Sequence, residues 1–372
     1  MKLWPLAAVT AVQLFLALAH GFIYWTWISF WNPLPELALL LLRVGLTVLA
    51  FSFAATTLAS FRSTSRIVAW FYTVAATWLG FLNFLFWAAC ASWIVWLVLR
   101  LSEPSAAVQF RADLCGIFTA AAVLAGLWGL VNARWIRVRR VMVRLEHLPA
   151  QWRGRKALLI SDLHLGAVNG RSFAERIVRM ARALEPDIVF IPGDLFDGGK
   201  VRTEDVLAPF SALRPVHGIY FSSGNHDEFG EMPLFAAAMQ KVGIRVLANE
   251  AVRVDGLAVI GVSYHDSGSP VRFRTVLQAL RPAPGEAAVL LNHVPTRLPI
   301  AEETGIALQL SGHTHAGQIF PFTWLTRRVF GHFTSGLHHY GSMAVYTSTG
   351  AGSWGPPMRV GSQPEMVLLN FE

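Results

Sequence analysis

Four long apolar stretches in the first third of the chain restrict its fold more than any other feature. They cover residues 4–28, 37–59, 67–98 and 112–133. A helix needs about 20 apolar residues to cross the hydrocarbon core of a bilayer, and only helices and closed barrels satisfy their backbone hydrogen bonds within lipid. The sequence therefore predicts an N-terminal transmembrane α-helical bundle of about four helices.

Two of these stretches leave an alternative open. The stretch at 67–98 is long enough for one tilted or bent helix, or for two shorter crossings. The first stretch contains Ala17-Leu18-Ala19, which resembles the small-residue cleavage site of a signal peptide. Its apolar run continues to Trp27, and aromatic residues of this kind mark the membrane interface, so we expect an uncleaved helix.

Charge and tryptophan content change after Ala133. Only six of the 31 Lys and Arg residues and three of the 23 acidic residues lie up to that point, together with ten of the 14 Trp residues. An apolar, Trp-rich segment followed by a normally charged one is typical of a membrane region joined to a water-soluble domain. We therefore expect a transmembrane helical domain at residues 1–134 and a soluble domain at residues 135–372.

The net charge of +8 comes partly from an arginine cluster directly after the last apolar stretch. Such a cluster is attracted to anionic lipid headgroups, so we expect membrane lipids as partners and no nucleic acid. The two cysteines, Cys90 and Cys115, lie within apolar stretches and form no metal-binding spacing. The cluster consists of Arg134, Arg137, Arg139, Arg140 and Arg144.

Basic residues in the short loops predict the orientation of the bundle. Residues 31–36 contain no Lys or Arg, whereas the next loop contains Arg62 and Arg66. Positive charge accumulates on the cytoplasmic side of a membrane. Four crossings then place both ends of the bundle and the soluble domain in the cytoplasm. A fifth crossing within 67–98 would oppose this, because it would place the arginine cluster outside.

From Trp135 onward, short strand-like runs alternate with short helices, which predicts an α/β or α+β layered domain. A half-exposed strand is expected within 135–145. A helix is expected from Ser172, because Ser172 and Glu175 have the spacing of a capping box, and another is expected at 233–242. Further strands are expected at 157–160, 187–191, 218–221, 257–262, 287–291, 306–310, 343–347 and 365–369.

Five of the expected strands lead into residues that bind metals or transfer protons. Active sites of open α/β sheets gather beyond the carboxyl ends of strands, and glycines there let the backbone approach a ligand closely. We therefore expect one site at which these residues meet. They are Asp162, His164, Asp194, Asn225, His226, Asp227, His293, His313 and His315.

This set of side chains matches the requirements of phosphate-ester hydrolysis. Two cations about 3.5–4 Å apart neutralise phosphoryl charge and turn a bridging water into a hydroxide near neutral pH. Mixed carboxylate, amide and imidazole ligands suit Mn, Fe or Zn better than Ca. We therefore expect two divalent metal ions as cofactors, with the bridging hydroxide as the nucleophile.

Taken in order, the site blocks resemble the calcineurin-like metallophosphoesterase superfamily. Region 135–372 is similar to its bacterial membrane-associated branch, which implies the inner (cytoplasmic) membrane. The resemblance also implies a four-layer α/β sandwich, with two central β-sheets flanked by helices. Ala316 departs from the pattern, because many relatives have glycine there. The blocks are Asp162-Leu163-His164, Gly193-Asp194, Gly224-Asn225-His226-Asp227, His293 and Gly312-His313-Thr314-His315. The C-terminal blocks are Thr334-Ser335-Gly336-Leu337, Ser348-Thr349-Gly350 and Pro364-Glu365.

The resemblance implies a role for each residue of the site. His226 faces the substrate as an imidazolium, and Asp227 orients it. Asp197 is a candidate for supporting the metal shell, whereas His338 and His339 either contact substrate or are ordinary loop residues. Asp162, His164 and His315 bind the first metal, Asp194 bridges both metals, and Asn225, His293 and His313 complete the second.

Together these expectations describe a membrane-anchored, metal-dependent phosphoesterase that hydrolyses a phosphodiester or pyrophosphate bond rather than a monoester. A lipid-linked substrate is favoured, because the tether keeps the soluble domain at the headgroup plane. A catalytically silent metal-binding scaffold is one alternative, against which the complete ligand set and His226 argue. A transporter or receptor with a regulatory phosphoesterase domain is another. Arg43 and Asn83, inside apolar stretches, are its only support, and an arginine near a helix end can instead reach the interface.

Overall fold

The computed structural model describes residues 4–372, with side chains from Thr10 onward. The chain divides into two compact units. One, the helical unit, comprises Met1–Val131 and Gly355–Met358, and the other, the α/β unit, comprises Asn132–Trp354 and Arg359–Glu372.

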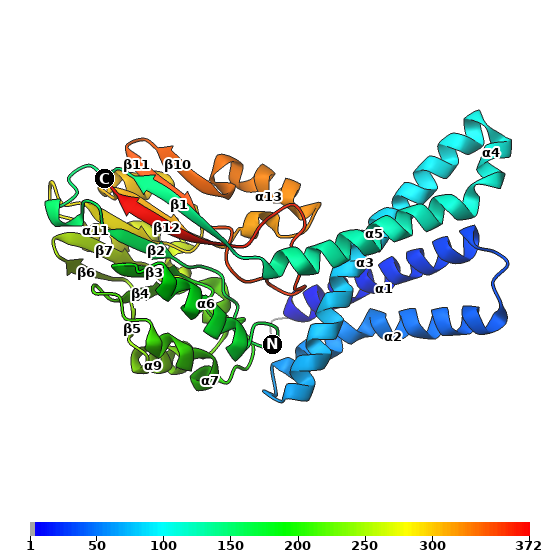
Figure 1. Ribbon diagram of the computed structural model, residues 1–372, viewed down its shortest axis with the longest axis horizontal. Coiled ribbons are helices and arrows are strands. Elements are labelled where there is room, and N and C mark those ends of the chain that lie inside the picture. Colours follow the sequence, from blue (N-terminus) through cyan, green and yellow to red (C-terminus); the bar gives the residue numbers. More distant parts are fainter. Residues whose placement is uncertain (1–3) are drawn as a thin grey trace. The chain divides into compact units, whose positions relative to one another are not determined.

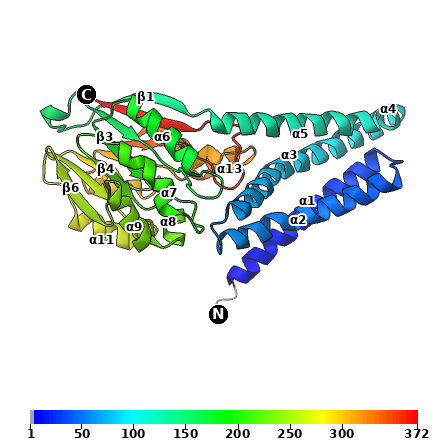
Figure 2. The same ribbon diagram turned by 60° about the horizontal axis from the view of Figure 1, so that its bottom comes forward.

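Among its described residues, the helical unit contains four helices that are long and apolar enough to cross a membrane, which confirms the predicted bundle. The stretch that allowed one or two crossings forms a single helix of 37 residues, α3. Helices α1, α2 and α3 pack against one another (Figure 2). The helices are α1 (Trp4–Phe30), α2 (Glu36–Ser60), α3 (Arg66–Ser102), the short α4 (Pro104–Gln109) and α5 (Arg111–Arg134).

Polar side chains inside the helical unit bond to one another. Trp78 Nε1 donates to Nε2 of His20 at 2.8 Å, and the guanidinium of Arg43 donates to the hydroxyl of Tyr24 at 3.3 Å. Arg43, whose side chain was expected to reach towards the membrane interface, thus has a hydrogen-bond partner on the neighbouring helix.

The α/β unit is built from two six-stranded sheets (Figure 1). In the first sheet the strand order is β1 (Arg137–Val143), β12 (Glu365–Phe371), β2 (Lys156–Leu159), β3 (Ile188–Pro192), β4 (Ile219–Ser222) and β5 (Ile244–Val246). In the second sheet the order is β10 (Gly336–Tyr340), β11 (Met343–Thr347), β9 (Leu308–Ser311), β8 (Ala288–Leu291), β7 (Leu257–Gly261) and β6 (Glu250–Val254).

The two faces of each sheet bury different sets of apolar side chains. Leu159 and Phe190 of the first sheet share a core with Val259 and Leu310 of the second. The neighbouring residue Leu158 faces the opposite way, into a core that includes residues of α6 (Arg171–Ala183) and α9 (Met232–Lys241). A third core lies between the second sheet and the helices α11 (Pro270–Ala279) and α12 (Leu298–Glu303). The predicted four-layer sandwich is therefore confirmed.

Strand direction brings the site residues to one edge of each sheet. Strands β2, β3 and β4 are mutually parallel, and so are β7, β8 and β9. The carboxyl ends of the strands in each group therefore lie at the same end of their sheet. The remaining helical elements are η1 (Ala150–Trp152), α7 (Thr203–Leu207), η2 (Ala208–Ala212), α8 (Asn225–Phe229), α10 (Tyr264–Ser267), η3 (His315–Gly317), α13 (Phe322–Phe330) and η4 (Gly331–Thr334).

One local prediction is wrong. Helix α6 begins at Arg171, with Gly170 as its N-cap and without a side-chain capping bond. Because Ser172 lies inside the first turn, its hydroxyl cannot cap the helix as the spacing to Glu175 suggested.

Candidate metal centre

The structure brings all seven predicted metal ligands together at the carboxyl ends of the strands. Asp162 and His164 follow β2, and Asp194 follows β3. Asn225 begins α8, directly after β4. The remaining ligands come from the second sheet, where His293 follows β8 and His313 and His315 follow β9.

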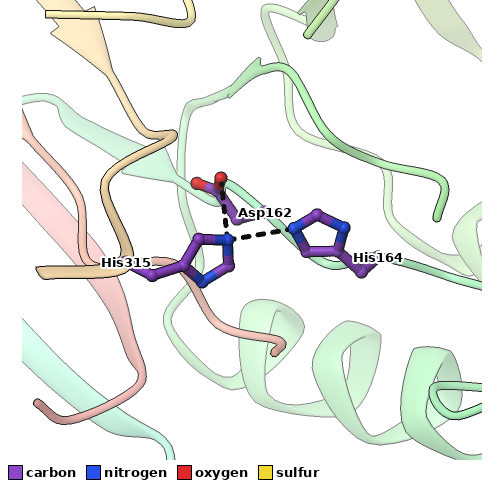
Figure 3. Close-up of side chains that lie close together, drawn as sticks. All are labelled: Asp162, His164 and His315. Carbon is purple, nitrogen blue, oxygen red and sulfur yellow. Dashed lines mark hydrogen bonds and ion pairs between the residues drawn. The ribbon is translucent and has the colours of Figure 1, made fainter. Parts of the chain in front are cut away.

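Asp162, His164 and His315 form the first group of ligands (Figure 3). Nε2 of His315 lies 3.0 Å from Nε2 of His164 and 3.4 Å from Oδ1 of Asp162. All three residues are buried. The other carboxylate oxygen of Asp162 accepts a hydrogen bond from the hydroxyl of Ser161, which fixes the carboxylate plane.

Asp194, His293 and His313 form the second group of ligands, and Asn225 completes it. Nδ1 of His313 lies 3.3 Å from Nε2 of His293. The amide oxygen of Asn225 lies 3.0 Å from Nδ1 of His313 and 3.2 Å from Nε2 of His293. Three ligand atoms therefore converge on one point.

Asp194 joins the two groups. Its Oδ2 lies 3.2 Å from Nε2 of His293, in the second group, and 3.8 Å from Nε2 of His164, in the first. Burial by itself raises the pKa of this carboxyl, but His293 and His164 outweigh burial and hold the pKa below its usual range. Asp194 is therefore the ionised carboxylate between the two groups, as the bridging role requires.

The backbone at the ligands is strained. Asp162, His164, Asp194, His313 and His315 all have φ between 47° and 69°. That left-handed region is unfavourable for residues with a Cβ, and such residues cluster at functional sites. The loops after β2, β3 and β9 thus adopt costly conformations that turn the side chains towards one another.

Gly312 shows how closely the second sheet approaches the first at the site. A Cβ at this position would lie 2.0 Å from Oγ of Ser161 and 2.1 Å from Oδ2 of Asp162. Only glycine therefore lets the loop after β9 pass beside the loop after β2, which brings His313 and His315 to the ligands of the first sheet.

The second ring nitrogens of two ligand histidines face oxygen atoms of the protein. Nδ1 of His293 lies 2.8 Å from the carbonyl oxygen of Pro192, which leaves Nε2 to bind a metal. Nδ1 of His164 lies 3.5 Å from the carboxylate of Asp197, the residue expected to support the metal shell. Partners of this kind orient an imidazole ligand and fix its tautomer.

Charge in the site differs from one histidine to the next. Burial lowers the pKa of His293, but the neighbouring Asp194 more than compensates and raises it to about 9. Burial and the positive charge of His293 lower the pKa of His313 to about 4. His313 is therefore neutral and ready to bind a metal near pH 7, whereas His293 must lose a proton first.

Arg359, which the sequence does not mark as a site residue, has its side chain buried beside the first group of ligands. Its guanidinium donates to the carbonyl oxygens of His315, Gly350 and Gly352, and its Nη2 lies 3.1 Å from Nδ1 of His315. Arg359 thus fixes the backbone and the imidazole ring of the ligand His315. No local pattern could reveal it, because its contact with the ligand loop joins residues 44 positions apart in the sequence.

The predicted role of Asp227 needs correction. Both of its carboxylate oxygens accept backbone hydrogen bonds, from Asp194 at 2.7 Å, Gly224 at 2.8 Å and Phe196 at 3.0 Å. Asp227 therefore anchors the loops after β3 and β4 instead of orienting His226. The bonds to Asp194 and Phe196 could not be anticipated, because those two amides belong to the loop after another strand.

His226 lies beside the metal ligands. Its Nδ1 lies 3.2 Å from the carbonyl oxygen of Asp197, so that residue orients the ring, and one of its ring nitrogens lies within 4.8 Å of the ligand atoms of His164 and Asp194. Burial and nearby His164 lower the pKa of His226. An anionic phosphoryl group next to the ring would favour the expected imidazolium.

The remaining expected site residues lie apart from this cluster. His338 and His339 are on β10, where Nε2 of His338 lies 3.1 Å from the carbonyl oxygen of Ser335. His339 lines a cavity of about 640 Å³ whose described lining residues include none of the predicted ligands. Substrate contact by these two histidines stays a prediction.

The C-terminal blocks support the site. A Cβ on Gly350 would lie 2.7 Å from Cβ of Asp162. Glu365 is buried, and its carboxylate pairs with Arg139 at 2.5 Å and accepts from the backbone of Thr349 at 3.1 Å. Arg139, assigned from the sequence to a lipid-binding cluster, is thus also an ion-pair partner within the α/β unit.

The donor set fits two metal ions. Unshared electron pairs of several imidazoles and two carboxylates converge in a buried space, where within each group the ligand atoms lie within 4.8 Å of one another. Such a concentration of donors is unfavourable unless positive charge lies between them. Neutral imidazole, amide oxygen and carboxylate are ligands that transition metals accept.

The comparisons with known proteins find metallophosphoesterases. Residues 155–317 match the model of the family described as calcineurin-like phosphoesterase. A zebrafish protein (Danio rerio) described as "Transmembrane protein with metallophosphoesterase domain" is 33% identical over 307 residues, which cover 77% of this chain and 70% of that protein. An "Uncharacterized metallophosphoesterase" of Helicobacter pylori is 31% identical over 219 residues, which cover 58% of this chain and 59% of that protein. A dimetal phosphatase structure from Danio rerio has a TM-score of 0.37 and 11% identity, and covers 54% of this chain and 88% of that one.

The two-sheet sandwich and its paired ligand groups define a metallophosphoesterase domain, here joined to transmembrane helices. The chain belongs to the calcineurin-like phosphoesterase family.

Proposed function

We propose that this protein hydrolyses a phosphodiester or pyrophosphate bond in a substrate embedded in the membrane. The observation that supports this proposal most directly is the position of Asp194. Its Oδ2 lies 3.2 Å from an imidazole of one ligand group and 3.8 Å from an imidazole of the other. That arrangement supports two metal ions held side by side. Mn, Fe or Zn suit the mixed nitrogen and oxygen ligands.

When bound, the two ions would neutralise phosphoryl charge and acidify a water molecule for attack. The chain itself supplies the rest of the reaction. We assign the contact with the substrate to His226. Its Nδ1 faces the carbonyl oxygen of Asp197, so its Nε2 would be the atom that meets the phosphoryl group. An imidazolium there would protonate the departing oxygen.

The transmembrane helices support the choice of a membrane substrate. Helix α5 ends at Arg134, and β1 begins at Arg137, so the α/β unit follows its membrane anchor without a linker. With four spanning helices and basic residues such as Arg62 and Arg66 in the loop after α2, the positive-inside rule favours a cytoplasmic α/β unit on the inner membrane of a bacterium.

The test is a paired assay on the full chain, purified in detergent. A chromogenic phosphodiester and the corresponding monoester are offered with Mn²⁺, beside an Asp194→Ala variant. We expect faster, metal-dependent turnover of the diester, which the variant loses. Bound metal without turnover of either ester would favour a metal-binding scaffold instead, and a faster monoester reaction would contradict the assigned bond type.

A further inference from the structure

Helix α13 exposes apolar side chains beside the metal centre. Phe322, Leu325 and Val329 are 54%, 51% and 66% exposed, and their i, i+3 and i+7 spacing places them along one face of the helix. The described side chains of this helix include none that is buried. A contiguous exposed apolar face of this kind marks an interaction surface.

The helix is coupled to the ligand histidines. It begins five residues after Gly317, the end of η3, and its last residue, Phe330, stacks edge-on against His313, with ring centroids 6.2 Å apart. On another side of the site, the exposed rings of Phe229 and Trp354 lie 5.6 and 5.7 Å from the ring of His226. Apolar surface therefore borders the metal centre.

Hydrogen bonds within the α/β unit connect this helix to the end of a membrane-spanning one. Asn132, in the last turn of α5, donates to the carbonyl oxygens of Arg359 and Ser362, both at 2.9 Å. In the same loop, Val360 exchanges backbone bonds with Gln318 and Phe320, at 3.0 and 2.9 Å, just before α13. The start of α13 is thus linked by hydrogen bonds, within the α/β unit, to the residue at which the last span ends.

The charge of the helix suits the same surroundings. Arg327 and Arg328 lie in its last turn, and its sequence contains no acidic residue. The guanidinium of Arg328 lies over the ring of Trp324, 5.8 Å from its centroid. Aromatic and basic residues on a short amphipathic helix are typical of helices that lie in the interface of an anionic bilayer.

We propose that α13 is an interfacial helix, which inserts Phe322, Leu325 and Val329 into an anionic lipid surface and presents the metal centre to headgroup phosphates. This inference deepens the proposed function, on which its catalytic consequence rests. Insertion itself does not depend on catalysis, so the two can be tested apart.

The first experiment measures depth. An environment-sensitive fluorophore is attached to Leu325→Cys in the full chain, with Cys90 and Cys115 replaced by alanine, in vesicles with and without phosphatidylglycerol. The control carries the label at Val271→Cys, which is 75% exposed on α11. We expect bromine-labelled lipids to quench the label at 325 and not at 271, more strongly with phosphatidylglycerol. Equal quenching at both positions, or none at 325, would overturn the proposal.

The second experiment measures catalysis in a triple variant, Phe322→Ser, Leu325→Ser and Val329→Ser. The matched control removes three exposed apolar side chains elsewhere, by Val216→Ser, Leu234→Ser and Val271→Ser. Two substrates are compared. One is CDP-diacylglycerol, a lipid pyrophosphate embedded in the bilayer, and the other is a soluble chromogenic diester. We expect the variant to lose about tenfold in turnover of the lipid, from lost apolar insertion, and to retain its turnover of the soluble diester.

The two experiments separate the two hypotheses. If neither substrate is hydrolysed but the label at 325 is quenched, the proposed function fails and the interfacial helix stands. If the soluble diester is hydrolysed but the label remains in water, the interfacial helix fails and the hydrolase stands. Equal loss of lipid turnover in the variant and its matched control would also count against the helix.

Discussion

Gly224→Ala tests the geometry on which the metal centre depends. Gly224 is the N-cap of α8, with φ of −103°, so alanine meets no backbone strain there. The added Cβ would, however, lie 2.2 Å from Oδ1 of Asp194 and 2.6 Å from its backbone nitrogen. Because Asp194 lies between both ligand groups, the substitution pushes directly on the bridging carboxylate.

The size of the effect follows from that distance. Ordinary van der Waals contact begins at 3.4 Å, so Asp194 or the loop must move by about 1 Å, and a displacement of about 1 Å in a catalytic site costs roughly 10²-fold in rate. Overpacking a buried site also costs about 1–3 kcal/mol of stability. We therefore expect a folded protein of lower stability with about 10²-fold lower metal-dependent turnover.

Gly170→Ala is the matched control. Gly170 is also a helix N-cap, with φ of −86°, and a Cβ there would have nothing within 4 Å. Diester turnover, metal content and thermal unfolding are measured for both variants and the original chain. If the Gly224→Ala variant binds metal and hydrolyses the diester as well as Gly170→Ala does, then Asp194 does not occupy a crowded bridging position.

Three further predictions follow from single contacts. The Asp194→Ala variant should lose both metal ions, whereas the Asp162→Ala variant should retain one, because Asp194 faces both ligand groups and Asp162 faces one. Identical metal contents of the two variants by mass spectrometry would contradict this. Arg359→Met should lower the free energy of unfolding by about 3 kcal/mol, since three loop carbonyls lose their donor; a denaturant midpoint unchanged from the original chain would show that Arg359 is dispensable. Ser222→Ala should cost only about 1 kcal/mol, because its hydroxyl bonds to Val262 and Leu291 of the other sheet, and the same denaturation experiment measures it.

The elements that could be predicted are those whose signal is local. A membrane-spanning helix is predicted by its own apolar residues, and a buried strand such as β3 is predicted by the apolar run at 188–192. Strands β5, β6 and β10 were missed. They are short or half-exposed strands at or next to the sheet edges, where residues such as Arg245 and His339 interrupt the apolar pattern.

The ligands could be predicted because each stands at the end of a recognisable strand, in an order that resembles a known family. The residues that position them could not. Arg359 and Asp227 bond to backbone groups of distant loops, and any Arg or Asp could do this if the fold placed it there. Only the three-dimensional path of the chain identifies such partners.

Those positioning residues explain how the site tolerates its own strain. Left-handed backbone at a residue with a Cβ costs of order 1 kcal/mol or more, and Asp194 and His315 both have it. Asp227 holds the backbone nitrogen of Asp194, and Arg359 holds the carbonyl oxygen of His315. Both anchors are protein groups, so the ligand loops are held in place before any metal binds. A site ordered in advance can direct its charge at the reacting phosphate without rearranging during the reaction.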